Sequence, residues 1–275
     1  MTVYGPRADC LKPLDPLRPA AAVLGRHVHP RRKRPRPTGR ISSVHAIDPG
    51  PASNKLLAAL PRTDFQLLAP YLTSLQLAEG TVLHEAGGEV DEVYFPLSGM
   101  ISLVVVMRDG KAIETATVGR EGVVGAMSGL GLHISLVRAI VQLPMFGSRI
   151  SSPQLRKIAA SSKPVADLCV RYNEVLLDHA RITAACNALH HIEARFCRWL
   201  LQTRDRAESD TFKLTQEFLS EMLGVRRTSV TEVASKIQAD GAISYSRGVI
   251  KILDLEALKA KSCECYETLR EQNGD

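Results

Sequence analysis

Two arginines, several hydroxyl side chains and one carboxylate lie together in a short segment, residues 226–232. An arginine fork can donate two hydrogen bonds to the O6 and N7 atoms of guanine, and a glutamate can accept one from the amino group of cytosine. With two polar residues before this segment and one arginine after it, these groups form a candidate set for contacts with double-stranded DNA. The candidates are Thr215, Gln216, Arg226, Arg227, Thr228, Ser229, Thr231, Glu232 and Arg247.

The surrounding sequence predicts two helices that meet in a short turn. Thr215 is placed to cap the first helix, Ser220 is small enough for a helix crossing, and Gly224 supplies the turn. The apolar residues expected to pack the pair are Leu219, Leu223, Val225, Val230 and Val233. Gly241 then ends the second helix, and the runs 243–245 and 249–253 flank a glycine turn. This order predicts a winged helix-turn-helix, and the alternative is a plain helical hairpin with exposed arginines.

The candidate residues have different expected roles. Arg227 is placed to read a guanine, and Glu232 either accepts from a cytosine amino group or repels phosphate. Arg247, in the turn of the wing, is expected to contact backbone phosphate. These roles predict a protein that reads a near-palindromic double-stranded site as a two-fold dimer.

Residues 1–52 differ in composition from the rest of the chain. They contain nine of the 15 prolines, ten of the 35 basic residues and three of the 29 acidic ones, which leaves 25 basic and 26 acidic residues elsewhere. The net charge of +6 therefore comes from this segment and does not by itself indicate nucleic-acid binding. Low apolar periodicity predicts disorder. A basic arm that contacts phosphates and an over-extended reading frame are the alternatives.

Short β-branched runs separated by turn residues predict antiparallel strands between residues 75 and 144. The runs are 93–97, 100–107, 113–118 and 138–143, and short amphipathic helices are expected before them. Asp109-Gly110 is a strong hairpin signal between two of these runs. The pattern predicts a sandwich or barrel of antiparallel strands.

Helical spacing begins near residue 152 and includes a heptad seam. Its members recur at alternating spacings of four and three, and they are Leu168, Tyr172, Val175, His179, Ile182, Cys186 and Leu189. Such a seam fits a helix lying on its own domain, and it equally fits the contact between two helices of a dimer. The pattern alone does not separate these interpretations.

The six cysteines include no Cys-x-x-Cys pair. Cys263 and Cys265 are close in sequence, but no second ligand pair is visible, so we interpret them as ordinary thiols in a C-terminal helix or tail. His190 and His191 would point about 100° apart on a helix, which favours a hinge over a metal site. The sequence therefore predicts no metal site.

Other functional classes lack their signals. No local motif supports a catalytic nucleophile, and the chain is not expected to be an enzyme. No apolar run approaches the roughly 18 residues of a membrane span, and no apolar core follows the basic residues of the N-terminus. We expect a cytoplasmic protein without a membrane partner.

The order of these elements resembles the Crp–Fnr family of bacterial transcription regulators. The segments that carry the resemblance are 79–83, 93–101, 119–125 and 214–253. The resemblance implies an α+β fold: an antiparallel β-roll of the cyclic-nucleotide-binding type, a long dimerisation helix and a C-terminal winged helix-turn-helix. It implies that the seam is the dimer contact of a homodimer, and RNA polymerase is expected as a further partner.

The sensor departs from the family pattern at the ligand positions. Members that bind cyclic AMP carry a glutamate after the glycine equivalent to Gly125, where this chain has Ala126, and Arg138 stands in a shortened Arg-Ser/Thr-Ala stretch. Gly125, Ala126 and Arg138 remain the candidate ligand residues, but we predict that cyclic AMP is not bound. Cys10 stands alone at the N-terminus, so an iron–sulfur cluster is not expected. The recognition segment departs as well, and base preferences are not carried over.

The predicted boundaries are a disordered tail (1–52), the sensor β-roll (53–150), a helical segment (151–191) with the dimer helix at about 164–190, the winged helix-turn-helix (192–260) and a C-terminal tail (261–275). The predicted function is a sequence-specific DNA-binding regulator with an unnamed signal. The alternative is a ligand-sensing module that acts through a protein partner without DNA specificity of its own.

Overall fold

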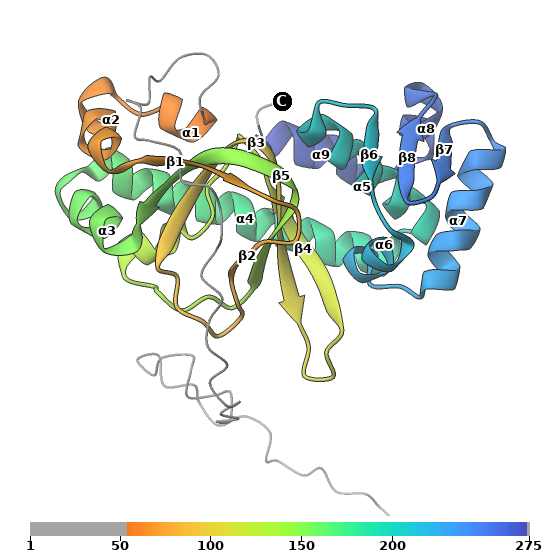
Figure 1. Ribbon diagram of the computed structural model, residues 1–275, viewed down its shortest axis with the longest axis horizontal. Helices are drawn as coiled ribbons and strands as arrows, with labels where there is room; N and C mark the ends of the chain where they lie inside the picture. The colour runs from red at the N-terminus through yellow and green to blue at the C-terminus, as the bar shows by residue number, and fades with distance from the viewer. Residues whose placement is uncertain (1–53, 274–275) are drawn as a thin grey trace, which may run out of the picture. The chain divides into compact units, whose positions relative to one another are not determined.

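The structure is a computed structural model that describes residues 54–273 (Figure 1). The segment predicted to be disordered, residues 1–52, lies outside the described residues, as does Cys10. Within the described part of the chain, no helix combines the length and the apolar character that a membrane crossing requires.

The first part of the described chain is an antiparallel sheet with short helices before it. Its elements are α1 (Lys55–Ala58), α2 (Arg62–Leu68), the 3-10 helix η2 (Ala69–Tyr71), β1 (Thr73–Leu77), β2 (Val82–His84), β3 (Glu92–Val106), β4 (Ala112–Val118), the 3-10 helix η3 (Ala126–Leu130) and β5 (Arg138–Ser151). The strands pair in the order β1-β5-β3-β4, and β2 also pairs with β5. All these pairings are antiparallel, which confirms the predicted roll.

Two strands expected to be separate form one long strand, β3. Its pairing with β5 shifts register on both sides of Ser98 and Gly99. Gly99 has a φ of +81°, and a Cβ atom there would lie 2.3 Å from the Pro144 carbonyl oxygen. Glycine therefore lets the strand continue through an irregularity that no larger residue would fit. The hairpin predicted at Asp109-Gly110 joins β3 to β4, with Gly110 at a φ of +86°.

The second part of the described chain is mostly helical. Its elements are α3 (Ser152–Ser161), α4 (Lys163–Leu189), α5 (Ile192–Ala207), β6 (Thr211–Lys213), α6 (Gln216–Leu223), α7 (Arg227–Ala239), β7 (Ile243–Ser246), β8 (Val249–Ile252), α8 (Leu255–Lys261) and α9 (Cys265–Asn273). The strand β6 was not predicted, and it completes a three-stranded sheet in the order β6-β8-β7.

The prediction of a C-terminal tail from residue 261 was wrong. Residues 265–273 form α9, which buries Cys265, Tyr266 and Leu269. The Tyr266 hydroxyl donates a hydrogen bond of 2.9 Å to Asp205 in α5. The apolar stripe of α9 is short, and its partners in α4 and α5 lie far earlier in the sequence, with 61 positions between Tyr266 and Asp205, so local periodicity could not reveal the packing.

The heptad seam of α4 faces the chain's own domains. Tyr172, His179 and Cys186 are 3%, 2% and 0% exposed, whereas Leu189 is 77% exposed at the end of the helix. The partly buried members that pack on the same chain are Leu168, Val175 and Ile182. The three buried side chains are covered by the chain itself, whereas the partly buried members and Leu189 keep exposed surface, so the dimer contact through this seam stays a prediction. The helix lies on its own domain, the interpretation that the pattern had left open.

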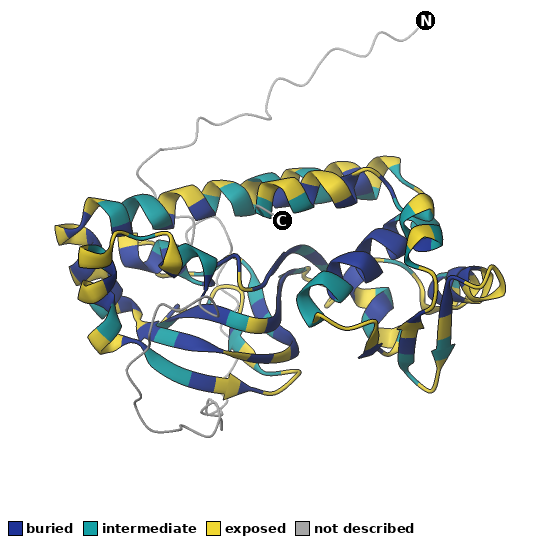
Figure 2. Cartoon of the chain, turned by 90° about the horizontal axis from the view of Figure 1, so that it is seen from above, coloured by how far each residue is buried: buried dark blue, intermediate teal, exposed yellow. Residues whose placement is uncertain are grey.

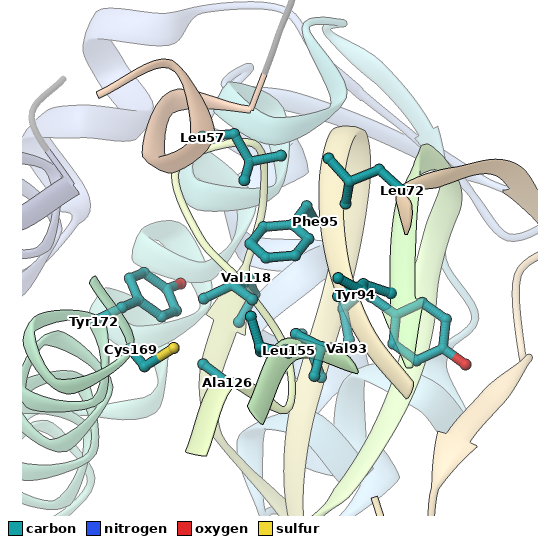
Figure 3. Packing of buried hydrophobic residues seen from close by; sticks show 14 of the residues in the cluster. Leu57, Leu72, Val93, Tyr94, Phe95, Val118, Ala126, Leu155, Cys169 and Tyr172 are labelled. Carbon is teal, nitrogen blue, oxygen red and sulfur yellow. The ribbon is translucent and has the colours of Figure 1, made fainter. Parts of the chain in front are cut away.

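Packing of α4 on the sensor is visible from close by (Figure 3). Tyr172 and Cys169 of α4 lie beside Val118 of β4 and Ala126 of η3, and all belong to one buried apolar cluster. A Cβ atom on Gly122 would lie 1.8 Å from the Tyr172 hydroxyl oxygen. Glycine at position 122 is therefore required for the tyrosine to enter the sensor core.

A different face of α4 is exposed. Val170 and Leu177 are 48% and 41% exposed, and Ala184 is also exposed. These three residues are spaced by seven, so they form a narrow apolar stripe along the helix. Figure 2 colours α4 in alternating buried, intermediate and exposed patches, as expected for a helix with one face on the domain and another in solvent.

Candidate DNA-binding site and sensor

The helix-turn-helix forms as predicted. The Thr215 side chain caps α6 by accepting a hydrogen bond of 3.1 Å from the Phe218 amide. Gly224 follows α6 in the left-handed conformation, with a φ of +64°. Helix α7 then begins at Arg227, with Arg226 as its N-cap residue. The face of α7 that packs inward consists of Val230, Val233, Ala234 and Ile237.

The candidate DNA-contacting residues lie on the outer surface of α6, α7 and the wing. The exposed ones are Thr215, Arg226, Arg227, Thr228, Thr231, Glu232 and Arg247, and the partly buried ones are Gln216 and Ser229. The Thr231 hydroxyl oxygen lies 3.1 Å from the side-chain oxygen of Gln216, so the two helices share a polar contact on this surface. The Arg227 guanidinium is 3.9 Å from the Glu217 carboxylate and 66% exposed.

The wing is a tight hairpin with an arginine at its tip. Arg247 and Gly248 have φ values of +50° and +75°. Two consecutive positive φ angles are typical of a type I′ turn, which matches the twist of a two-residue hairpin. The exposed Lys251 of β8 and Lys213 of β6 add positive charge to the same small sheet. The wing therefore presents cations suited to phosphate contacts.

The candidate ligand residues of the sensor do not form an open polar site. Ala126 is 6% exposed and belongs to the buried apolar cluster. A Cβ atom on Gly125 would lie 2.8 Å from Val90, so the backbone is closely packed there. The Arg138 side chain is ion-paired with Glu85, at 2.8 Å between Nε and Oε2. A phosphate would have to compete with this carboxylate for the guanidinium.

A cleft of about 760 Å³ lies elsewhere, between the sensor sheet and the DNA-binding part. Its lining includes Ser98 and Pro144 from the sensor, and Arg204 and Asp210 from the second part. None of the three candidate ligand residues lines this cleft. The family-like ligand position and this cleft are therefore different places in the fold.

The DNA-binding part is joined to the sensor sheet by a buried hydrogen bond. The Trp199 indole donates to Glu114 Oε1 at 2.9 Å, and the Ser102 hydroxyl donates to Glu114 Oε2 at 2.6 Å. Burial raises the pKa of the Glu114 carboxyl, and hydrogen bonds from Ser102 and Trp199 oppose this. Sequence analysis missed this contact because no local signal relates residues 85 positions apart.

A buried ion pair makes a second connection between the two parts. Arg206 of α5 and Glu121 of the sensor have 2.9 Å between Nη2 and Oε1, and both side chains are 7% exposed. The Gly119 amide donates to the same carboxylate oxygen at 2.9 Å. Sequence analysis did not single out either residue of the pair, since an arginine in a helix gives no sign that it will be buried.

The predicted hinge lies between α4 and α5. His190 is the C-cap of α4, and His191 is the N-cap of α5. Cys263 and Cys265, interpreted from the sequence as ordinary thiols, lie close to Cys186 and His190 in the fold. The sequence did not show these two neighbours, which come from the end of α4.

Two family models match the chain in the order of its domains. The cyclic nucleotide-binding domain matches residues 74–161, and the Crp-like helix-turn-helix domain matches residues 194–261. The chain belongs to the Crp–Fnr family of bacterial transcription regulators. Proteins of this family are transcription regulators and not enzymes.

Solved Crp–Fnr structures share the fold at low sequence identity. A Crp/Fnr-family regulator from Eubacterium rectale has a TM-score of 0.61 and 19% identity, and the match covers 78% of this chain and 97% of that one. FixK2 from Bradyrhizobium japonicum has a TM-score of 0.60 and 17% identity, with 70% and 98% covered. The c-di-GMP responsive regulator CLP of Xanthomonas campestris has a TM-score of 0.58 and 15% identity, with 70% and 99% covered. No curated protein matches the chain by sequence.

Proposed function

We propose that this Crp–Fnr protein is a homodimeric, sequence-specific DNA-binding regulator whose sensor does not respond to cyclic AMP. The observation that carries the proposal is the exposed start of α7, where Arg226, Arg227 and Thr228 face solvent beside the wing. A recognition helix enters the major groove with its N-terminal residues against the base edges. The proposal places the protein in the cytoplasm, at promoters and with RNA polymerase as a further partner.

The exposed stripe of α4 supports the dimer. Val170, Leu177 and Ala184 repeat every seven residues on a face that the chain itself leaves uncovered. Packing this stripe against its copy would bury apolar surface in a parallel helix pair. A two-fold dimer then presents two α7 helices to half-sites about 34 Å apart, which predicts a near-palindromic target.

The sensor geometry supports the absence of a cyclic AMP response. Ala126 has no polar group to hold a ribose hydroxyl, and a site that lacks that hydrogen bond loses much of its discrimination. Arg138 is already paired with Glu85. The Xanthomonas regulator with the same fold is described as responsive to c-di-GMP, so this dinucleotide should be titrated beside cyclic AMP. Calorimetry that detects tight cyclic AMP binding would refute this part of the proposal.

Selection from random double-stranded DNA tests the DNA-binding function. The full chain should enrich a two-fold sequence, and the affinity should fall linearly with salt on a double-logarithmic plot because phosphate contacts release counterions. Enrichment of no sequence would favour the rival function, a sensing module that acts through a protein partner. Repeating the selection with purified RNA polymerase separates direct reading of DNA from recruitment by the partner.

A further inference from the structure

Three cysteines and one histidine from distant parts of the chain meet at the hinge between α4 and α5. Cys186 lies in the last turns of α4 and His190 caps that helix. Cys263 lies between α8 and α9, and Cys265 is the first residue of α9. Their four ligand atoms all lie within 4.8 Å of one another. Local sequence spacing does not create this group, because 77 positions separate Cys186 from Cys263.

The distances within the group match one tetrahedral ion. The sulfur atoms of Cys186 and Cys263 are 3.6 Å apart, and the sulfur of Cys265 is 3.6 Å from His190 Nδ1. Zinc bound to sulfur at about 2.3 Å and nitrogen at about 2.0 Å gives tetrahedral edges of roughly 3.8 Å between sulfurs and 3.6 Å between sulfur and nitrogen. These two edges match a single ion, and the remaining distances within the group do not exceed 4.8 Å. The ligands of an iron–sulfur cluster surround several metal atoms instead.

The histidine is oriented as in a ligand supported by a carboxylate. His190 Nε2 lies 3.2 Å from Glu264 Oε1, and its Nδ1 faces the thiols. When the Nε2–H group donates a hydrogen bond to the carboxylate, the proton of the neutral imidazole is on Nε2, and the lone pair of Nδ1 is free to bind a metal. Metal-binding histidines usually donate their other ring proton to such a partner. A purely structural cysteine cluster would have no need of this arrangement.

Burial and charge also suit a structural ion. Cys186, Cys263 and Cys265 are 0%, 5% and 8% exposed, and the His190 side chain is 23% exposed, which leaves a path for entry. Three thiolates around a divalent ion carry a net charge of −1. The positive charges of Arg195 and Arg198 in α5 act on these thiols and would balance that charge.

We propose that Cys186, His190, Cys263 and Cys265 bind one zinc ion that fastens the C-terminal helix α9 to the end of α4. Three soft thiolates and one imidazole are the ligand set that favours zinc in a closed structural site. The ion would hold the junction from which α5 leads into the DNA-binding domain. This proposal does not depend on DNA binding, and its test uses no DNA.

The test is the metal content of the full chain, purified without added chelator or added metal. Mass spectrometry of the elements should find one zinc per chain. Replacing zinc by Co²⁺ should give the ligand-field bands of a tetrahedral ion and thiolate charge-transfer absorption. H190A and C263S should each lose the zinc. The matched controls H191A, at the exposed neighbouring histidine, and C197S, at a buried cysteine outside the group, should retain it.

The supporting carboxylate provides a graded test. E264A should weaken zinc binding by about 10–100-fold in competition with a chelator, as expected for loss of a ligand's supporting partner. E267A, in the first turn of α9, should leave the affinity unchanged. The proposal would be overturned if the purified chain contained no zinc and all its cysteines reacted with an alkylating agent without prior reduction, because the cysteines would then be free thiols. A zinc-free chain with a Cys186–Cys263 disulfide would overturn it in favour of a redox pair.

Discussion

The indole of Trp199 donates a hydrogen bond of 2.9 Å to the carboxylate of Glu114, and this contact joins the first helix of the DNA-binding part to the sensor sheet. Trp199 is 2% exposed and Glu114 is 7% exposed. A buried polar pair of this kind stabilises the fold only while both partners are satisfied. The bond lies beside an apolar cluster in which Met100, Val104 and Leu143 of the sensor pack with residues of the DNA-binding part.

The Trp199–Glu114 bond predicts non-additive effects in a double-mutant cycle. W199F removes the donor and leaves a buried acceptor less satisfied, so it should lower the free energy of unfolding by about 1–3 kcal/mol. W199F combined with E114Q should cost less than the sum of the two single variants, because they share one bond. Urea unfolding followed by circular dichroism measures each corner of the cycle. Glu121 does not contact Trp199, so the losses of unfolding free energy caused by E121Q and W199F should simply add. If the losses caused by E114Q and W199F also added, the prediction would be contradicted.

The ion pair of Arg206 and Glu121 predicts a large cost for removing one partner. R206M leaves a buried carboxylate without its counter-charge and should destabilise the chain by roughly 3–5 kcal/mol. The double variant R206M/E121L removes both charges and should recover much of that loss. The neighbouring pair of Arg120 and Glu208, with 51% and 70% of the side chains exposed, is the control. R120M should cost less than about 1 kcal/mol, and equal losses at the two arginines would show that burial does not matter here.

The buried histidines predict a loss of stability in acid. Burial, and secondly the charge of Arg206, lower the pKa of His179 to about 4, while Glu121 and Asp178 oppose this shift. Burial lowers the pKa of His84 to about 4 as well. The unfolded chain binds these protons near pH 6.5 and the folded chain only near pH 4, so the stability contributed by neutral histidine is lost as the pH falls through this window.

The slope with pH distinguishes His179 from an exposed histidine. For each buried histidine that stays neutral in the folded chain, the free energy of unfolding should fall by up to about 1.4 kcal/mol for each pH unit below pH 6.5, down to about pH 4. H179Q should reduce the pH dependence between pH 6.5 and pH 4, and H133Q, at an exposed position, should not. The fluorescence of Trp199, the single tryptophan, reports the unfolding. An unchanged slope in H179Q would mean that His179 is already protonated in the folded chain.

The strands, the hairpin and the helix-turn-helix could be predicted because their signals are local. Asp109-Gly110 and Gly224 mark turns by backbone conformation alone, and the inward valines of α7 follow helical spacing. Contacts between distant segments could not be predicted in the same way. The heptad seam of α4 is an example. Its spacing indicates that one face of the helix is buried, but it does not indicate whether that face packs on a partner subunit or on the same chain.

The cysteine group illustrates the same limit. Cys263 and Cys265 alone have the spacing of only half a metal site, and the other half comes from the hinge at His190. The hinge itself was predicted from the adjacent histidines, but the position of α9 against α4 was not. Local spacing does not relate α9 to the end of α4, because only the packing of the whole chain brings these two helix ends together.

The exposed stripe of α4 predicts which substitutions separate the subunits. L177E places a negative charge in the centre of the stripe formed with Val170 and Ala184. In a dimer that uses this stripe, the carboxylate would be buried with no opposite charge beside it. Sedimentation at micromolar concentration should then show a monomer, with the melting temperature of the monomer fold retained. L189E, at the 77% exposed residue that ends the helix, should remain dimeric. A dimeric L177E protein would place the subunit contact on another surface.

Arg227 and Arg247 belong to different elements of the proposed DNA-binding surface and should affect DNA binding differently. Arg227 begins α7, where a side chain can reach a base edge, and its fork suits the O6 and N7 atoms of guanine. R227A should therefore cost about 1–3 kcal/mol at the cognate base pair and relax the preference at that position. Arg247 stands at the tip of the wing with a φ of +50°, and R247A should weaken all sequences alike and lower the salt slope by about one.

Selection from random DNA and salt titration of the enriched site distinguish these two signatures. The exposed Lys157 of α3 lies outside the DNA-binding part, so K157A should change neither the preferred sequence nor the salt slope. Glu217 places a carboxylate 3.9 Å from the Arg227 guanidinium, where its negative charge would oppose the approach of DNA phosphates. E217A should consequently tighten binding without changing the preferred base. If R227A kept the full sequence preference, the reading residue would have to be sought among the hydroxyl side chains of the same helix.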